Sequence, residues 1–184
     1  MNIYFDTEFT GLHKNTTLVS IAFIAETDET FYGEFTDYDR NQVDEWLQNN
    51  VIENLYYNDF DGEGIIIDDD LKSFEIKANK NSIKEALIEW FAQFNETIEI
   101  WSDCLSYDWV LFNDIFEHAF LIPSNIYYIP FDISTLFKLK NVDPDINREE
   151  FVRQNLQSDF VAIKHNALSD AKIIKKCYNK LMTI

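Results

Sequence analysis

The order in which strand-like and helix-like segments follow one another constrains the fold of this chain more than any other feature. Residues 2–6, 17–25 and 30–35 are rich in Ile, Val, Phe, Tyr and Thr and are separated by polar stretches, a pattern typical of an antiparallel meander. Helical and strand patterns alternate after that point, which favours parallel crossovers. We therefore predict an α/β fold with a mixed five-stranded sheet, an antiparallel meander plus parallel crossovers, flanked by helices.

The spacing of apolar residues predicts the elements of the alternating part. They are, in chain order, a helix within 39–49, a helix opened by the capping-box form of Ser82 to Glu85, a strand over 97–101, a helix that begins at Ser106, a strand over 127–133 and a C-terminal helix with Ser169 near its cap. The segment from Glu53 to Lys80 has no clear period and carries eight acids against three lysines. We expect this segment to be long and irregular, with room for a hairpin near Gly64.

Length and cysteine content limit the domain organisation and the compartment. With 184 residues, 46% of them hydrophobic, the chain can bury one substantial core, and we expect a single domain over 1–184. No segment resembles a secretory signal, and no apolar run is long enough to span a bilayer. Cys104 and Cys177 are too few for a disulfide framework or a zinc site. We therefore expect a cytoplasmic protein without a membrane partner.

The charge is strongly negative and unevenly distributed. The formal net charge is −18, which ordinarily argues against a nucleic-acid partner because phosphate contacts dominate such affinities. From Lys164 onwards, however, five lysines face one acid, Asp170, so that this part carries +4 and the rest −22. Lys172, Lys175, Lys176 and Lys180 lie on the polar side of the last predicted helix. They either hold phosphates or form an ordinary solvated helix face.

Two acids follow the first strand pattern. Asp6 and Glu8 are two residues apart, and the period of a strand places both side chains on one face. Because the preceding apolar residues predict a buried strand, these carboxylates arrive at a sheet end where desolvated anions need cations. Oxygen ligands of this kind suit Mg²⁺ or Mn²⁺. A solvated strand end is the alternative for such a pair taken alone.

A third acid is expected beside the first two. Asp108 lies in the first turn of the helix after the 97–101 strand, where the helix dipole favours an anion and a crossover brings it toward Asp6. A plain N-terminal helix acid is the alternative. Asp103 competes for the same role, whereas Asp114 lies deeper in the helix and is expected to face away.

The last patch combines a histidine with a fourth acid. Asp170, at the start of the last helix, can reach a metal held by Asp6 and Glu8, and His165 in the preceding loop can approach a water bound to that metal. A neutral imidazole accepts a proton near pH 7, although we expect nearby carboxylates to raise its pKa. A surface loop histidine is the alternative. The other two histidines, at positions 13 and 118, lack such partners.

These patches resemble the motifs of a known enzyme family. Asp6 to Leu12 resembles the Asp-x-Glu-x-Thr-Gly-Leu motif of the DEDDh group of 3′ to 5′ exonucleases in the ribonuclease-H-like superfamily, and His165 to Ala171 resembles its His-x-Ala-x-x-Asp-Ala motif. Tyr107 to Leu111 keeps the aromatic residue, the acid and the Leu of the middle motif, but 102–105 departs from the common His-Asn-Ala lead-in. The closest resemblance, over most of the chain, is to small bacterial exoribonucleases of mycobacterial type. The segment 58–79 is longer and more acidic than that subgroup suggests.

The resemblance implies a ribonuclease-H-like fold and a metal-dependent 3′ to 5′ exonuclease that releases nucleoside 5′-monophosphates. It implies two divalent ions, Mg²⁺ or Mn²⁺, as cofactors. Asp6, Glu8 and Asp170 would hold the ion that bears the attacking water. Asp6 and Asp108 would place the second ion, and His165 would take the proton of the water.

The substrate expected from this resemblance is single-stranded or 3′-overhanging nucleic acid, with RNA preferred to DNA. Phe9, Leu12 and Trp109 are candidates to contact the terminal bases, although each also suits a core. A DNA exonuclease with the same machinery is the first alternative. An acidic binding protein that imitates nucleic acid, suggested by the net charge of −18, is the second. The oligomeric state is left open, a dimer included.

Overall fold

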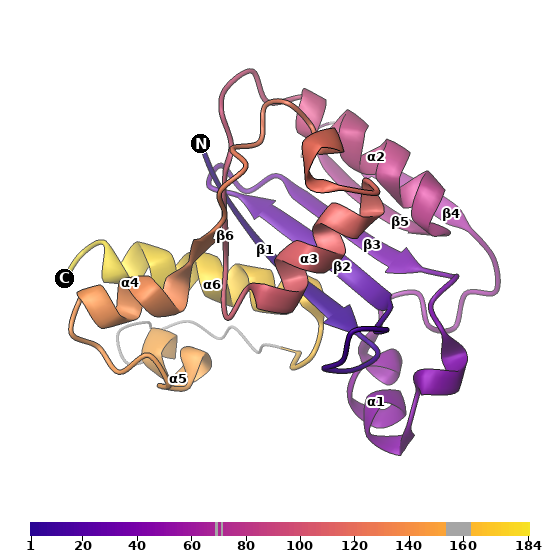
Figure 1. The fold of residues 1–184 in the computed structure, drawn as a ribbon, viewed down its shortest axis with the longest axis horizontal. Coiled ribbons are helices and arrows are strands. Elements are labelled where there is room, and N and C mark those ends of the chain that lie inside the picture. Colours follow the sequence, from indigo (N-terminus) through magenta and orange to yellow (C-terminus); the bar gives the residue numbers. More distant parts are fainter. Residues whose placement is uncertain (69, 71, 154–162) are drawn as a thin grey trace.

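The computed structural model describes residues 1–68, 70, 72–153 and 163–184, and its centre is one mixed β-sheet (Figure 1). The strands are β1 (Asn2–Phe9), β2 (Leu18–Ala25), β3 (Thr30–Phe35), β4 (Gly64–Asp68), β5 (Ser73–Ala78), β6 (Glu99–Ser102) and β7 (Phe131–Asp132). The α-helices are α1 (Glu45–Asn50), α2 (Lys80–Ala92), α3 (Ser106–Ile115), α4 (Ile133–Leu139), α5 (Arg148–Arg153) and α6 (Ala167–Leu181). Short 3₁₀ helices cover Arg40–Gln42, Ile52–Asn54 and Ala119–Leu121.

The predicted fold class is confirmed, with a wider sheet than expected. Strands β1, β2 and β3 form the antiparallel meander, and β6 and β7 join β1 through parallel pairs. The predicted number of five strands is wrong, because the order β4-β5-β3-β2-β1-β6-β7 contains seven. The two additional strands come from the acidic segment expected to be irregular. They pair antiparallel with each other, which confirms the hairpin expected near Gly64. In β5, the buried residues Phe74, Ile76 and Ala78 alternate with polar ones. This alternation is short and flanked by acids, so the sequence did not distinguish it from an irregular polar segment.

Two predicted boundaries are wrong for local reasons. The strand expected over 127–133 shrinks to β7, and α4 follows it directly because the Asp132 carboxylate caps that helix through the Ser134 N–H at 2.7 Å. Helix α2 begins before the predicted capping box. The side-chain oxygen of Asn79 accepts hydrogen bonds from the N–H groups of Asn81 and Ser82, so that Ser82 lies inside the first turn instead of capping it.

The sheet separates two apolar layers. Residues Ile3 and Phe5 of β1 point into a core formed with α2 and α3, whereas Tyr4 points to the other face, against α4, α5 and α6. Figure 1 shows α2 and α3 on one side of the sheet and α6 on the other. The alternation of β1 therefore decides on which face each of its polar residues emerges at the end of the strand.

Helix α6 is fastened to the sheet through a buried lysine. The Lys175 ammonium donates to the carbonyl oxygens of Ala25 and Glu26 at 2.7 and 3.0 Å and to the Asp28 carboxylate at 2.7 Å. Lys180 bonds to the carbonyl oxygen of Phe151. These two lysines of the predicted phosphate-binding face therefore have structural roles.

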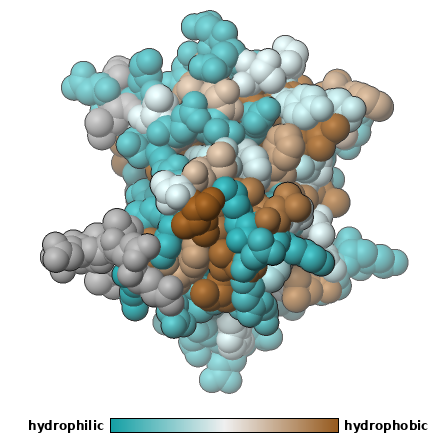
Figure 2. Space-filling model, turned by 90° about the vertical axis from the view of Figure 1, so that its left-hand side faces the viewer, coloured by the Kyte–Doolittle hydropathy of each residue, from teal (hydrophilic) through white to brown (hydrophobic). Residues whose placement is uncertain are grey.

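The surface is mixed in polarity. Figure 2 shows the side that carries α4 and the C-terminus, where hydrophobic side chains form a small area among hydrophilic ones. Leu139 of α4 is 74% exposed there, and Met182 after α6 is 55% exposed. Among the described residues, no helix has the length and apolar character needed to cross a membrane.

Candidate active site

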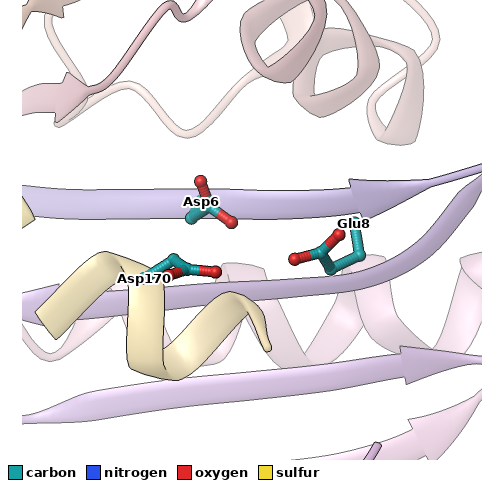
Figure 3. A group of neighbouring side chains, drawn as sticks. All are labelled: Asp6, Glu8 and Asp170. Atoms are coloured by element: carbon teal, nitrogen blue, oxygen red, sulfur yellow. The ribbon is translucent and has the colours of Figure 1, made fainter. Parts of the chain in front are cut away.

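Three carboxylates meet where β1 ends and α6 begins. Asp6 and Glu8 share the α6 face of β1, and Asp170 lies in the first turn of α6. One oxygen from each lies within 4.8 Å of the others, and Figure 3 shows the three side chains grouped between strand and helix. The structure thus brings together three of the five polar residues selected from the sequence, across 164 positions of the chain (170 − 6).

Burial and mutual repulsion disfavour the ionised forms of these three carboxyls. Burial, followed by the charges of Asp170 and Asp108, raises the pKa of Glu8 to about 8. Burial and the charge of Glu149 raise the pKa of Asp170 to about 7. For Asp6, burial and four neighbouring acids raise the pKa well above its ordinary value. Such a group of anions at the end of a buried strand is short of positive charge.

The backbone before α6 orients Asp170. Asn166 caps the helix, since its side-chain oxygen accepts the Ser169 N–H at 3.2 Å. The N–H groups of His165 and Asn166 donate to the Asp170 carboxylate and partly offset the rise in its pKa. Asn166 is completely buried. Residues 165–170 therefore form one capping structure, in which the backbone at His165 and Asn166 sets the position of Asp170.

The His165 imidazole lies outside the group of three carboxylates and packs against helix α1. Its ring contacts that of Trp46 edge to face, with centroids 5.1 Å apart. The loop is also held by Asn54, which donates to the carbonyl oxygen of Lys164 at 2.9 Å and accepts from the Asn166 amide at 3.0 Å. The expected rise in the pKa of His165 is wrong. Burial and the charge of Lys164 lower that pKa.

Asp108 approaches the site from the opposite face of β1. Its Oδ1 accepts hydrogen bonds from the N–H and hydroxyl of Thr7, at 3.1 and 2.6 Å. Although Asp108 does not belong to the group within 4.8 Å, its charge is the second cause of the raised pKa of Asp6. Asp108 is 6% exposed. It is therefore a buried acid adjacent to the cluster, held by the residue between Asp6 and Glu8.

The competing acids have other partners. Asp103 forms a two-point ion pair with Arg148, at 2.6 and 2.9 Å, and accepts the Ser134 hydroxyl at 2.7 Å. Asp114 pairs with Lys80 at 2.9 Å on the surface. Neither carboxylate is free to join the group formed by the other acids.

A buried polar row continues from Glu8 across the sheet. Ser20 of β2 is paired opposite Glu8, and Glu34 of β3 is paired opposite Ser20, so that the three side chains share one face. Ser20 Oγ and Glu34 Oε2 are both buried and have no hydrogen-bond partner among the described residues. The row therefore places two buried polar atoms without partners among the described residues on the same face of the sheet as Glu8.

Comparison with known protein families identifies the family of the chain. The family described as 3'-5' exoribonuclease Rv2179c-like domain matches residues 1–182. The chain belongs to this family. Comparison with individual curated proteins gave no match. Family membership confirms the predicted resemblance to exoribonucleases of mycobacterial type and identifies the chain as a nuclease domain whose substrate class is RNA.

The site of this Rv2179c-like domain opens into a cavity of about 370 Å³. Asp6 and Asp170 line one part of it, with His165 beside them. Two cations, Arg148 and Lys164, line another part. Sequence reasoning missed Arg148, because its position follows from its ion pair with residue 103, 45 positions away. Of these two cations, Arg148 is already paired with Asp103, so that Lys164 is the better candidate to receive a phosphate of RNA.

The residues predicted to contact terminal bases differ in exposure. Leu12, beyond the end of β1, is 77% exposed. Phe9 stacks on Tyr107 with ring centroids 5.5 Å apart, and Trp109 packs on the core near Phe112. In this exoribonuclease domain, contact of all three with a base remains a prediction, and Leu12 is the most accessible.

Proposed function

We propose that this chain is a metal-dependent 3′ to 5′ exoribonuclease that removes nucleoside 5′-monophosphates from single-stranded or 3′-overhanging RNA. The observation that carries the proposal is the group of Asp6, Glu8 and Asp170, whose oxygens lie within 4.8 Å of one another in a chain of an exoribonuclease family. Carboxylate oxygens are hard ligands, and because burial and neighbouring acids raise the pKa of Glu8 and Asp170, a bound cation would stabilise their ionised forms.

The group of Asp6, Glu8 and Asp170 fits one of the implied metals. Asp6, Glu8 and Asp170 would hold one ion, and Asp6 with Asp108 would hold the second. Two Mg²⁺ or Mn²⁺ ions bound there would supply Lewis-acid chemistry, which activates water and stabilises charge on the departing 3′ oxygen. Burial raises the pKa of Asp108, and the N–H and hydroxyl of Thr7, which both donate to Oδ1, would partly offset this rise and orient the carboxylate.

His165 would act as the general base. Its lowered pKa keeps the imidazole neutral at pH 7, so that it can accept the proton of the attacking water. Trp46 holds the ring at the rim of the cavity. The accepted proton leaves through solvent, and in-line displacement at the terminal phosphodiester releases the nucleoside 5′-monophosphate. Lys164, which lines the same cavity, would bind a neighbouring phosphate.

The test is a gel assay on matched RNA and DNA oligonucleotides, each labelled at the 5′ end, with and without a complementary strand. We expect a ladder that shortens from the 3′ end of RNA in Mg²⁺ or Mn²⁺ and stops in EDTA. Asp6→Ala, Asp170→Ala and His165→Ala should each remove most of the activity. Asp114→Ala, a surface acid paired with Lys80, is the matched control and should retain it.

Other results would point to the alternatives. Faster shortening of DNA than of RNA would identify a DNA exonuclease with the same site. A folded protein that shortens neither, whatever the metal, would refute the enzyme and favour an acidic protein that imitates nucleic acid, as its net charge of −18 suggests.

A further inference from the structure

The outer edge of the sheet, at β4, carries features that the nuclease site does not explain. Strand β4 pairs with β5 on one side, and no other strand of the described residues covers its opposite edge. Figure 1 shows it at the margin of the sheet. An edge strand presents unpaired N–H and C=O groups at every second residue. This edge is therefore a template to which one further strand can be added.

The side chains of β4 are apolar and accessible. Ile65, Ile66 and Ile67 are 48%, 57% and 43% exposed. Ile65 and Ile67 lie opposite the buried Ile76 and Phe74 and so share the α2 face, whereas Ile66 emerges on the other face. Native proteins usually protect such edges with lysines, prolines or bulges. Three consecutive isoleucines on an open edge indicate a surface that is covered by a partner.

A cavity lies beside this edge on the face of Ile66. It has a volume of about 290 Å³ and is lined mainly by apolar atoms, with Tyr57 and Phe60 forming one wall. Lys77 fixes this wall, since its ammonium donates to the carbonyl oxygens of Tyr57 and Phe60 at 2.6 and 2.7 Å. A strand added to β4 would project alternate side chains into this cavity, the arrangement by which added strands gain specificity.

The charge around the edge selects the partner. From Asp59 to Asp70 the sequence contains six acids and no basic residue, and Asp59 and Asp61 are exposed. A second copy of the chain, with a net charge of −18, would bring like charges together, and RNA would be repelled in the same way. A basic segment would be attracted.

We propose that β4 is a docking site for an extended, basic segment of another protein, which adds to the sheet as an eighth strand and places apolar side chains beside Ile66. The backbone of β4 supplies hydrogen bonds to the added strand, and the flanking acids attract its lysines or arginines. Strands β5, β3 and β2 separate this surface from β1, which carries Asp6 and Glu8, so that its occupation and the nuclease activity can be measured separately.

The test uses three labelled peptides of about eight residues, long enough to span an ordinary strand, with the full-length protein. One alternates Val and Lys, one alternates Val and Glu, and one has the first composition with prolines in place of two valines. Fluorescence anisotropy reports binding, and amide hydrogen exchange reports protection of residues 64–68. We expect the Val–Lys peptide alone to bind, with slower exchange along β4 and weaker binding at high salt.

Two variants and a control locate the site. Ile66→Lys should weaken binding of the Val–Lys peptide by about tenfold or more, because it adds a like charge to the edge. Leu139→Lys, at an even more exposed apolar position on α4, should leave it unchanged. The double variant Asp59→Asn and Asp61→Asn keeps the strand intact and should reduce both the affinity and its salt dependence.

Three results would overturn the proposal. One is equal binding of all three peptides, and another is binding without protection of 64–68. The third is a dimer of the chain that forms through β4 and is lost in Ile66→Lys, which would identify a second copy as the occupant.

Discussion

Replacing Asp170 by asparagine should make the protein more stable in EDTA, and the gain should grow with pH. Burial and Glu149 raise the pKa of Asp170 from 3.8 to about 7. A carboxyl whose folded pKa is raised contributes stability below its unfolded pKa and loses it as the pH rises through the folded value. The amide that replaces the carboxyl in Asp170→Asn stays neutral, so the variant escapes this loss.

The size of the gain follows from the shift. A rise of about three units is equivalent to about 4 kcal/mol of unfolding free energy once the carboxyl is ionised in both states. The site retains contact with solvent through its cavity, and Asp6 and Glu8 share the repulsion. We therefore expect a gain of about 2 kcal/mol near pH 8.5, or about 4 to 8 °C in melting temperature, and about half of it near pH 5.5.

The assay is urea denaturation in EDTA, followed by far-UV circular dichroism, at the two pH values. Asp114→Asn is the control, because its carboxylate is exposed and paired with Lys80, and a change of no more than about 0.5 kcal/mol is expected. Mn²⁺ should stabilise the wild-type protein and have a much smaller effect on Asp170→Asn, which has lost one ligand. A folded Asp170→Asn variant that is no more stable than the wild type near pH 8.5 would refute the electrostatic strain described for the three carboxylates.

Three further predictions concern residues around the site. Thr7→Val should lower the unfolding free energy by about 1 to 2 kcal/mol and reduce kcat, because buried Asp108 loses its hydroxyl donor at 2.6 Å. Urea denaturation measures the first effect, and single-turnover kinetics measures the second. Trp46→Ala should reduce kcat more than KM by freeing His165, and Trp46→Phe should restore most of it, as measured by initial rates on a short RNA. Lys175→Met should cost about 2 to 4 kcal/mol in urea denaturation, because two carbonyl oxygens and a carboxylate lose their donor.

Each of these has a control and a contrary result. Thr27→Val removes a hydroxyl that bonds an exposed carboxylate and should hardly change the unfolding free energy. If Thr7→Val and Thr27→Val lowered the unfolding free energy equally, the buried bond between Thr7 and Asp108 would have no special role. Equal activity of the two Trp46 variants would show that the ring does not hold His165. Lys138→Met, on the exposed side of α4, is the control for Lys175→Met and should leave the unfolding free energy unchanged. A Lys175→Met protein as stable as the wild type would mean that its bonds to the β2–β3 turn contribute nothing.

Local periodicity was enough to predict most of the fold. Helix α3 follows its apolar spacing, whereas β2 and β3, which are buried at nearly every residue, were predicted from their β-branched and aromatic residues. Strand β5 could not be predicted in the same way. Its buried residues Phe74 and Ile76 alternate with Glu75 and Lys77, which have their own partners in the 57–60 segment, and short alternation among charges does not distinguish a strand from a polar loop.

The acids of the site were accessible to sequence reasoning, but their surroundings were not. The spacing of Asp6 and Glu8 fixes their common face, and the capping pattern fixes the place of Asp170. The contacts of Thr7 with Asp108 and of Trp46 with His165 join residues more than 100 positions apart. They arise from how helices pack on the sheet, and no local signal encodes them. The pKa of His165 was predicted in the wrong direction because its distance from the carboxylates depends on those same contacts.

The attachment of α6 has a mechanical consequence. Lys175 clamps the middle of the helix to the β2–β3 turn, whereas Asp170, about 7 Å nearer its start by the helical rise, is repelled by the acids of β1. The start of the helix is held as well, because Ala167 and Leu168 are buried against Ala22 and Tyr32 of the sheet. Asp170 lies between these two attachments, so the fold itself sets its distance from Asp6 and Glu8, and the three carboxylates stay together although they repel one another.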